Sequence, residues 1–413
     1  MPPMIEFPLD LPQVRVVKTE WQEDALVITV ESTRAYAVCS QCGQKTFKFH
    51  SYDEPIRLRH LPILEKRVFI ELRPQRYRCL KCEGHPTTTQ QCEWYEPRAP
   101  HTKAFDQSLL RELIHSTISD VARKQAVSYD AVLGALRRGV AIAVNWDEFT
   151  ALPVLGMDEI ALRKGHRDFV VIVTLRRDDG TLALLGVLAD RKKETVVAFL
   201  RSIPPALRTS VARVCTDMYE GFTNAVKEEL PQAQVVVDRF HVAKAYRACA
   251  DQLRKSELRE LKQDLPEDEY KLLKGTMWPF RRNAADLDTE QAEAVDLLLE
   301  CAPELRKAYD LREDLSAIFD TEQSKEAATQ ALTEWAAKVK QSGLQCFNSF
   351  LTTLANWRDE ITNYFLDRQN SGFQEGFNNK LKVLKRRCYG ITNTAHLFQR
   401  IWLDLEGYQR FGL

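Results

Sequence analysis

A carboxylate interrupts an apolar run in the stretch LPVLGMDEI, residues 152–160. The run predicts a β-strand over residues 154–160, and the interior of a strand is an unfavourable place for Asp158 unless its side chain faces a cation. The neighbouring carboxylate, Glu159, would point to the opposite face, because side chains alternate along a strand. We therefore take Asp158 as the candidate metal ligand and Glu159 as its rival.

Further apolar segments predict a sheet around this strand. We expect the other strands over residues 168–175, 182–188, 212–216 and 234–237. The turn signal RDDG at 177–180 makes the first three strands antiparallel, and helices expected at 193–202 and 221–230 make the later strands parallel. Three meandering strands followed by helix, strand, helix and strand are the element order of the ribonuclease-H-like fold.

Two more carboxylates complete a candidate site. Asp217 ends the fourth predicted strand, which neighbours the first in this fold, so Asp158 and Asp217 would meet at one edge of the sheet. A divalent metal would relieve their repulsion and supply a catalyst for phosphodiester chemistry. We expect the third acid on a late helix, where Glu375 shares one face with residues at steps of four, three and four. These residues are Asn379, Lys382 and Arg386.

A solvated amphipathic helix would show the same spacing, but the local charge favours a site beside nucleic acid. Residues 371–413 contain seven Lys or Arg against three acids. We therefore expect DNA contacts on this helix from Asn379, Lys382, Lys385 and Arg386.

Two C-x-x-C pairs predict a metal site near the start of the chain. They are formed by Cys39, Cys42, Cys79 and Cys82. Four thiolates suit the tetrahedral geometry of one structural Zn²⁺, and apolar residues at 68–72 predict hairpin strands that bring the pairs together. A disulfide framework is not expected, because thiols of a cytoplasmic protein stay reduced. His85 and Cys92 lie close behind the second pair and could replace one ligand.

Residues 119–132, SDVARKQAVSYDAV, have the residue pattern of a helix-turn-helix. Ala122 is small enough to let two helices approach, Val127 and Val132 would fill the core between them, and Ser128 would cap the second helix. We expect early residues of that helix to reach base edges and its later arginines to hold phosphates. The expected DNA-contact residues are Ser128, Tyr129, Arg137 and Arg138.

The composition is that of a globular protein, with a formal net charge of zero from 58 basic and 58 acidic residues. No apolar stretch approaches the roughly 20 residues of a membrane helix, and the first residues do not resemble a secretion signal, so we expect a soluble, cytoplasmic protein with no membrane partner. The charge is segregated: residues 34–81 carry an excess of seven positive charges and residues 251–370 an excess of eight negative charges. We therefore expect DNA along the first stretch and not along the second.

Taken together, these motifs resemble the bacterial DDE transposases, specifically the ISL-three family of insertion-sequence transposases. The resemblance spans most of the chain, from the cysteine pairs and the helix-turn-helix to a series of blocks around the acids. The blocks are GMDE at 156–159, RKGH at 163–166, TDM at 216–218, DRFH at 238–241, EGFN at 375–378, KR at 385–386 and YG at 389–390.

This resemblance implies a transposase that binds the terminal inverted repeats of a mobile element in double-stranded DNA and joins the element to target DNA. It implies Asp158, Asp217 and Glu375 as the catalytic ligands of two Mg²⁺ (or Mn²⁺) ions, with Asp238 and His241 in support. Asp238 is also a rival for a direct catalytic role. Because inverted repeats pair two ends, we expect a homodimer on DNA, associated with the bacterial nucleoid.

Two other functions fit the same residues. The first is a ribonuclease-H-like, structure-directed nuclease or resolvase that cuts DNA without strand transfer. The second is a zinc-dependent DNA-binding regulator without enzymatic activity.

The expected fold class is a multidomain α+β protein. It combines an N-terminal zinc-binding β module (1–98), a helix-turn-helix domain (99–150) and a ribonuclease-H-like α/β catalytic domain in two parts (151–248 and 369–413), interrupted by an all-α insertion (249–368). From its negative charge we expect the insertion to make dimer contacts or to shield the active site. We expect its tryptophans in the core: Trp278, Trp335 and Trp357.

Overall fold

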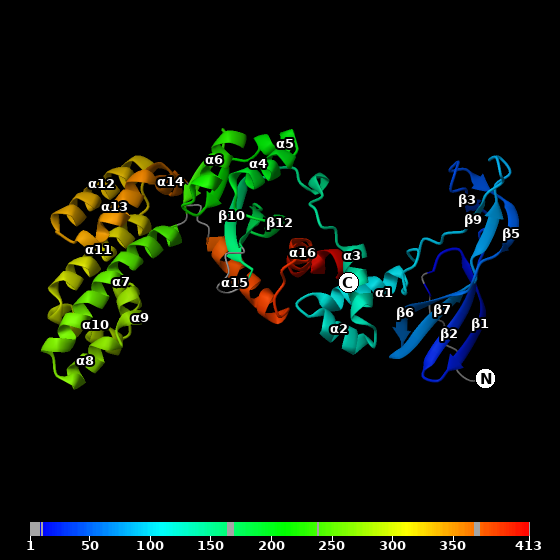
Figure 1. The fold of residues 1–413 in the computed structure, drawn as a ribbon, viewed down its shortest axis with the longest axis horizontal. Helices are drawn as coiled ribbons and strands as arrows, with labels where there is room; N and C mark the ends of the chain where they lie inside the picture. Colours follow the sequence, from blue (N-terminus) through cyan, green and yellow to red (C-terminus); the bar gives the residue numbers. More distant parts are fainter. Residues whose placement is uncertain (1–8, 10, 163–168, 238, 367–371, 413) are drawn as a thin grey trace. The chain divides into compact units, whose positions relative to one another are not determined.

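The computed structural model describes residues 9, 11–162, 169–237, 239–366 and 372–412, with the backbone only at residues 272 and 372–375. The chain forms two compact units, whose elements are labelled in Figure 1. The first unit spans residues 1–142 and 399–413, and the second spans residues 143–398. Within the described parts, no helix combines the length and the apolar character needed to cross a membrane.

A four-stranded sheet opens the first unit, in the order β1-β2-β7-β6. Its strands are β1 (Val14–Gln22), β2 (Ala25–Ser32), β6 (Ile56–Ile63) and β7 (Lys66–Leu72). In β7, Val68, Ile70 and Leu72 are buried and the residues between them are only half-buried, so the strand buries one face. β6 and β7 pair as the predicted hairpin.

Two smaller sheets carry the cysteine pairs. They contain β3 (Ala37–Val38) with β4 (Lys45–Thr46), and β5 (Lys48–Tyr52) with β8 (Gln75–Arg78) and β9 (Thr87–Thr89). The first cysteine pair lies in the turn between β3 and β4, and the second in the loop between β8 and β9. Because β5 follows β4 almost directly and pairs with β8, the two loops are brought together.

Three helices follow in the first unit, and each begins at a hydroxyl cap. They are α1 (Lys103–Leu113), α2 (Ile118–Gln125) and α3 (Tyr129–Gly139), capped by Thr102, Thr117 and Ser128. α2 ends at Ala126, whose φ of 50° turns the chain into α3. The buried side chains of Val121, Val132 and Leu136 pack with Leu403 of α16 (Thr394–Phe411) in one core. The helix-turn-helix predicted from residues 119–132 is confirmed.

A five-stranded sheet organises the second unit, in the order β12-β11-β10-β13-β14. Its strands are β10 (Val154–Ala161), β11 (Phe169–Arg176), β12 (Leu182–Leu188), β13 (Arg213–Thr216) and β14 (Gln234–Val237). β10, β11 and β12 pair antiparallel, whereas β13 pairs parallel with both β10 and β14. These pairings match the predicted sheet.

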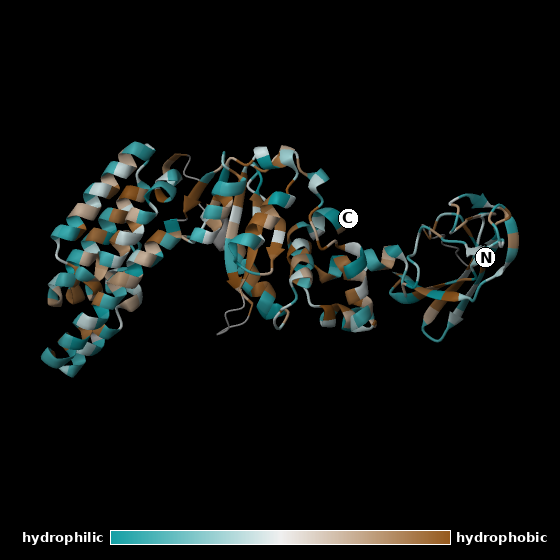
Figure 2. Ribbon diagram, turned by 45° about the horizontal axis from the view of Figure 1, so that its top comes forward, coloured by the Kyte–Doolittle hydropathy of each residue, from teal (hydrophilic) through white to brown (hydrophobic). Residues whose placement is uncertain are grey.

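Helices cover one face of this sheet. They are α4 (Lys193–Ser202), α5 (Pro205–Thr209) and α6 (Glu220–Glu229), preceded by the short η1 (Trp146–Glu148). Leu155 and Met157 of β10 pack with Val196 of α4 and Phe222 of α6. Hydrophobic residues accordingly gather along the strands in Figure 2.

The described chain between β14 and α15, residues 239–366, is helical. Its elements are α7 (Arg239–Asp264), α8 (Glu267–Lys274), α9 (Met277–Arg281), η2 (Ala284–Asp286), α10 (Thr289–Cys301), α11 (Pro303–Asp320), α12 (Lys325–Gln341), η3 (Gln345–Phe347), α13 (Asn348–Asn356), α14 (Arg358–Thr362) and η4 (Asn363–Leu366). Trp335 is buried against Tyr246 and Phe350, as expected. The expectation for Trp278 was wrong, because this side chain is 67% exposed. Trp357 is half-buried at the edge of the same core.

Candidate active site

Strand pairing brings Asp158 and Asp217 to the same level of the sheet. β10 and β13 run parallel with Gly156 opposite Cys215. Asp158 lies two residues beyond Gly156, still in β10, and Asp217 lies two residues beyond Cys215, directly after β13. Neighbouring parallel strands therefore place the two carboxylates side by side, as the sequence predicted.

The environment of Asp217 disfavours a negative charge. Its pKa is raised to about 6, chiefly by burial and further by the charge of Asp158, against an opposing effect of His241. The Oδ1 atom of Asp217 is buried and accepts no hydrogen bond from the described residues. A buried carboxylate oxygen that lacks a donor and faces a second carboxylate fits a cation, which would supply the missing positive charge.

Helix α15 (Gly372–Arg387) packs against β10 and adds two polar contacts to this edge of the sheet. The side-chain amide of Asn378 donates a hydrogen bond to Oδ2 of Asp158, whose Oδ1 accepts the backbone N–H of Glu159 at 2.7 Å. Lys385 donates to the backbone carbonyl of Ala161, and burial lowers the pKa of this ammonium group. Asp158 is thus held in one orientation, and α15 is fixed at the end of β10.

Glu159, the rival to Asp158, is engaged elsewhere. Its carboxylate forms an ion pair with Arg191 at 3.1 Å, and the Arg191 guanidinium also lies over the rings of Phe169 and Tyr219. The ion pair compensates the charge of Glu159, and Asp158 remains the candidate metal ligand.

Three predicted positions lie wholly or partly outside the described residues. Asp238 and the RKGH block at 163–166 are not described, and Glu375 is described by its backbone only, in α15. The predicted supporting residue His241 lies in α7, close enough to Asp217 to affect its pKa.

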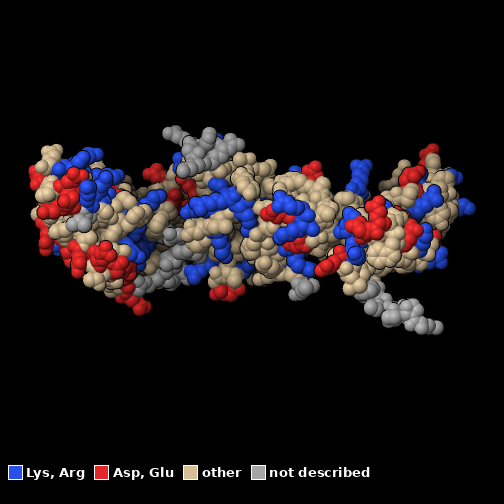
Figure 3. Space-filling model, turned by 90° about the horizontal axis from the view of Figure 1, so that it is seen from below, with Lys and Arg blue, Asp and Glu red and all other residues tan. Residues whose placement is uncertain are grey.

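Three of the four predicted DNA-contact residues of α15 lie on its exposed side. Asn379, Lys382 and Arg386 are exposed, and Lys382 donates to Asn379 at 3.3 Å. Figure 3 shows a band of Lys and Arg side chains where Figure 1 places α15. Lys385, by contrast, is half-buried against β10.

The four cysteines of the two pairs form one cluster in the first unit. Their sulfur atoms all lie within 4.8 Å of one another, and three of the Sγ–Sγ distances are 3.7, 3.8 and 3.9 Å. Sulfurs bound tetrahedrally at about 2.3 Å from Zn²⁺ are separated by about 3.8 Å. The geometry of Cys39, Cys42, Cys79 and Cys82 therefore fits a structural zinc.

Backbone donors in the first cysteine turn favour the thiolate form that a metal requires. The backbone N–H groups of Cys42 and Gln41 lower the pKa of Cys39 to about 6. Hydrogen bonds with the neighbouring thiols, chiefly that of Cys42, raise the pKa of Cys82 to about 12. The alternative ligands lie outside the cluster: His85 Nδ1 is 3.1 Å from the carbonyl oxygen of Cys79, and Cys92 packs in the core of the larger sheet.

All four predicted contact residues of α3 and its cap are exposed to solvent. Ser128 accepts the backbone N–H of Ala131 at 3.1 Å as the helix cap, and Tyr129 and Arg137 are exposed. Arg138 is exposed as well, and it also donates two hydrogen bonds to Asp106, at 2.6 and 2.9 Å. Asp106 also binds His101, so this arginine takes part in a polar network within the unit.

Sequence reasoning missed Asn378 and Arg191. The helix face was counted from Glu375 to Asn379, but Asn378 lies three residues after Glu375, which is also about one helical turn. Applying that second spacing could have found Asn378. Arg191 follows β12 outside any recognised motif, and nothing in the local pattern indicated its contact with Glu159.

Three family models match the chain. Residues 155–401 match a model described as transposase. Residues 35–82 match the zinc-finger of transposase IS204/IS1001/IS1096/IS1165. Residues 90–140 match the helix-turn-helix domain of transposase family ISL3.

Curated relatives agree with these models. The chain is 30% identical over 399 residues to the transposase for insertion sequence element IS1001 of Bordetella parapertussis, covering 96% of each chain. It is 23% identical over 402 residues to the transposase for insertion sequence element IS1557 of Mycobacterium tuberculosis, covering 90% of this chain and 87% of the relative.

Proposed function

The chain belongs to the ISL3 family of transposases, and we propose that this DNA transposase cleaves and joins DNA with Asp158, Asp217 and Glu375 as its metal ligands. The observation that carries the proposal is the state of Asp217: its carboxylate is half-buried, its buried Oδ1 accepts no hydrogen bond from the described residues, and its pKa is raised beside Asp158. Glu375 belongs to α15, three residues before the Asn378 that contacts Asp158.

Two Mg²⁺ or Mn²⁺ ions would be held by these carboxylates, since hard divalent cations prefer oxygen ligands. When bound, such ions polarise the attacking water or 3′ hydroxyl and stabilise the leaving oxygen. Asn378 orients Asp158 through its hydrogen bond. The charge of His241 favours the ionised form of Asp217, and we assign it, with Asp238, a supporting role.

We further propose that the second unit has a ribonuclease-H-like fold interrupted by an all-α insertion. The sheet order and the helical chain between β14 and α15 support this assignment. The boundaries expected from the sequence, at residues 98, 150, 248 and 368, are retained as part of the proposal.

DNA recognition is proposed for the first unit and for α15. One Zn²⁺ would hold the cysteine cluster together, and Ser128, Tyr129 and Arg137 would face the terminal inverted repeats. Asn379, Lys382 and Arg386 would contact the DNA backbone near the catalytic carboxylates. Two copies of the chain would pair two element ends, as a homodimer on DNA.

The test is cleavage and joining of a DNA fragment that carries the candidate terminal repeats, with and without Mg²⁺. Asp217→Ala should abolish both reactions, because the metal ligand is lost. The matched control is Asp178→Ala, which removes an exposed aspartate in the β11–β12 turn. Full activity of Asp217→Ala would contradict the assignment of the metal ligands. Cleavage by the wild-type protein without any joined product would favour a nuclease.

A further inference from the structure

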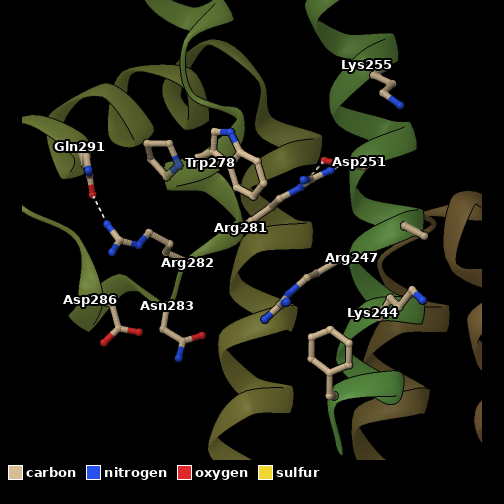
Figure 4. Close-up of a pocket in the computed structure, with 13 residues that line it drawn as sticks. Lys244, Arg247, Asp251, Lys255, Trp278, Arg281, Arg282, Asn283, Asp286 and Gln291 are labelled. Carbon is tan, nitrogen blue, oxygen red and sulfur yellow. Dashed lines mark hydrogen bonds and ion pairs between the residues drawn. The ribbon is translucent and has the colours of Figure 1, made fainter. Parts of the chain in front are cut away.

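A pocket among the helices between β14 and α15 is lined by several cationic side chains, although residues 251–370 are negatively charged overall. Its volume is about 790 Å³, and it lies between α7 and the segment from α9 to the start of α10 (Figure 4). The lining includes five cationic side chains and two carboxylates. The cationic residues are Lys244, Arg247, Lys255, Arg281 and Arg282.

With five cationic residues against Asp251 and Asp286, the lining has a net formal charge of plus three. Asp251 is paired with Arg281 in the pocket and with Arg254 at 3.4 Å. Lys244 and Lys255 are exposed and form no ion pair with the described residues. Arg282 donates to the neutral side chain of Gln291 at 2.9 Å. The pocket therefore offers several cations to an anionic ligand.

An exposed aromatic side chain lies among these cations. Trp278 is 67% exposed and Phe240, also in the lining, is 39% exposed. The guanidinium of Arg281 lies 5.3 Å from the centre of the Trp278 ring, and its ion pair with Asp251 holds it there. Figure 4 shows the indole beside this ion pair, and Arg247 extending from α7 toward the segment that carries Arg282 and Asn283. The indole thus contacts a paired guanidinium and still leaves most of its surface exposed.

The combination of an exposed aromatic ring and an excess of cations is the chemistry that recognises an unpaired nucleotide. A base stacks on the ring irrespective of its identity, and the cations follow the phosphates. The volume lies within the range of about 300–1,000 Å³ typical of pockets for single small ligands. A base-paired helix, whose major groove alone is about 12 Å wide, is too broad to enter such a pocket.

We propose that this pocket binds an unpaired segment of DNA, with Trp278 stacking on a base and Lys244, Lys255 and Arg282 holding its phosphates. The proposal rests on the protein acting on DNA, and it assigns to the helical chain a DNA contact that its net charge argued against. It does not depend on which carboxylates bind the catalytic metal.

The proposal is tested with the full chain by fluorescence anisotropy on two labelled probes without divalent cations. One probe is a blunt duplex, and the other is the same duplex with a short single-stranded thymidine overhang. Trp278→Ala should weaken binding of the overhang probe by about tenfold, the loss typical of one stacked base, and leave the blunt duplex unchanged. Trp278→Phe, which keeps an aromatic ring, should restore most of the affinity.

The lysines give a second measurement that does not alter the aromatic ring. The double variant Lys244→Ala/Lys255→Ala should weaken the overhang probe selectively, whereas Lys262→Ala, an exposed lysine of α7 outside the pocket, should not. Equal loss on both probes, or wild-type binding of the overhang by Trp278→Ala, would overturn the proposal. A third outcome would also overturn it: the Trp278 and lysine variants lose affinity for free dATP but keep full affinity for the overhang probe. The occupant of the pocket would then be a free nucleotide.

Discussion

Asp217 destabilises the metal-free protein at neutral pH. The ordinary pKa of its carboxyl is 3.8, and in the folded chain the pKa is raised to about 6. Between these values the unfolded chain has already lost the proton that the folded chain retains, so the stability of the fold decreases as the pH rises from about 4 to about 6. Above that pH the folded state bears the full cost of ionising this half-buried carboxylate beside Asp158.

Asp217→Asn should therefore stabilise the protein while it abolishes catalysis. Without added Mg²⁺ or Mn²⁺ we expect a gain of about 2 kcal/mol in the free energy of unfolding above pH 7, reduced toward pH 4. Denaturant unfolding of both proteins at several pH values measures this gain. A constant difference across that range would show that the carboxylate does not titrate as described.

Asn378→Ala should impair the reaction without removing a carboxylate. The substitution removes one of the contacts that orient Asp158, and loss of such an orienting contact typically lowers metal affinity or activity by about 10–100-fold. The measurement is the Mg²⁺ dependence of cleavage, with Asn356→Ala, an exposed asparagine of α13, as control. Equal Mg²⁺ dependence in wild type and Asn378→Ala would exclude the orienting role.

At the residue scale, sequence and structure agree where a short-range rule applies. Asp158 and Asp217 could be placed together because Asp158 interrupts one apolar strand, Asp217 directly follows another, and the pairing of these neighbouring strands fixes their level. The environment of Trp278 could not be predicted, because its exposure depends on how α9 packs on α7 and not on its neighbours in the chain.

At the scale of elements, the contact between α1 and α3 depends on a glycine. A Cβ atom added at Gly139 would lie 2.3 Å from Cδ1 of Leu110, a buried side chain of α1. Gly139→Ala should therefore destabilise the first unit by about 1–3 kcal/mol, the usual cost of overpacking. Gly134→Ala, in the same helix, meets only the flexible end of Arg138 and should stabilise it by up to about 1 kcal/mol. Thermal unfolding measures both effects, and the same shift in both variants would contradict the packing argument.

The apolar periodicity of the sequence predicted where helices and strands lie better than it predicted which of them pack together. The strands of the five-stranded sheet and the helix-turn-helix follow from local apolar patterns and caps. The pairing of α16 with α1 and α3 joins segments almost 300 residues apart, as in the hydrogen bond from Arg111 to the Phe411 carbonyl at 2.7 Å. No local pattern identifies such a partner, because the apolar face of a helix does not specify what covers it.

At the scale of the whole molecule, net charge conceals differences between parts. The formal charge is zero, yet residues 34–81 are strongly basic and residues 251–370 acidic. Even the acidic part contains the cationic pocket around Trp278. Adding up the charges along the sequence does not reveal this pocket. Binding to DNA follows the local potential of each surface, so neither the total nor a regional sum decides it.

The division into two compact units predicts that loss of zinc affects one unit alone. The small sheets around the cysteine cluster have few apolar residues, so we expect a chelator selective for zinc to destabilise the first unit, because structural zinc sites depend on the metal for folding. Calorimetry should show one transition lowered and the transition of the second unit unchanged, with binding to terminal repeats lost. Cys79→Ser should reproduce this result and Cys92→Ala should not, since Cys92 lies outside the cluster. A Cys79→Ser protein that unfolds like the wild type and binds the repeats would refute a structural role for the metal.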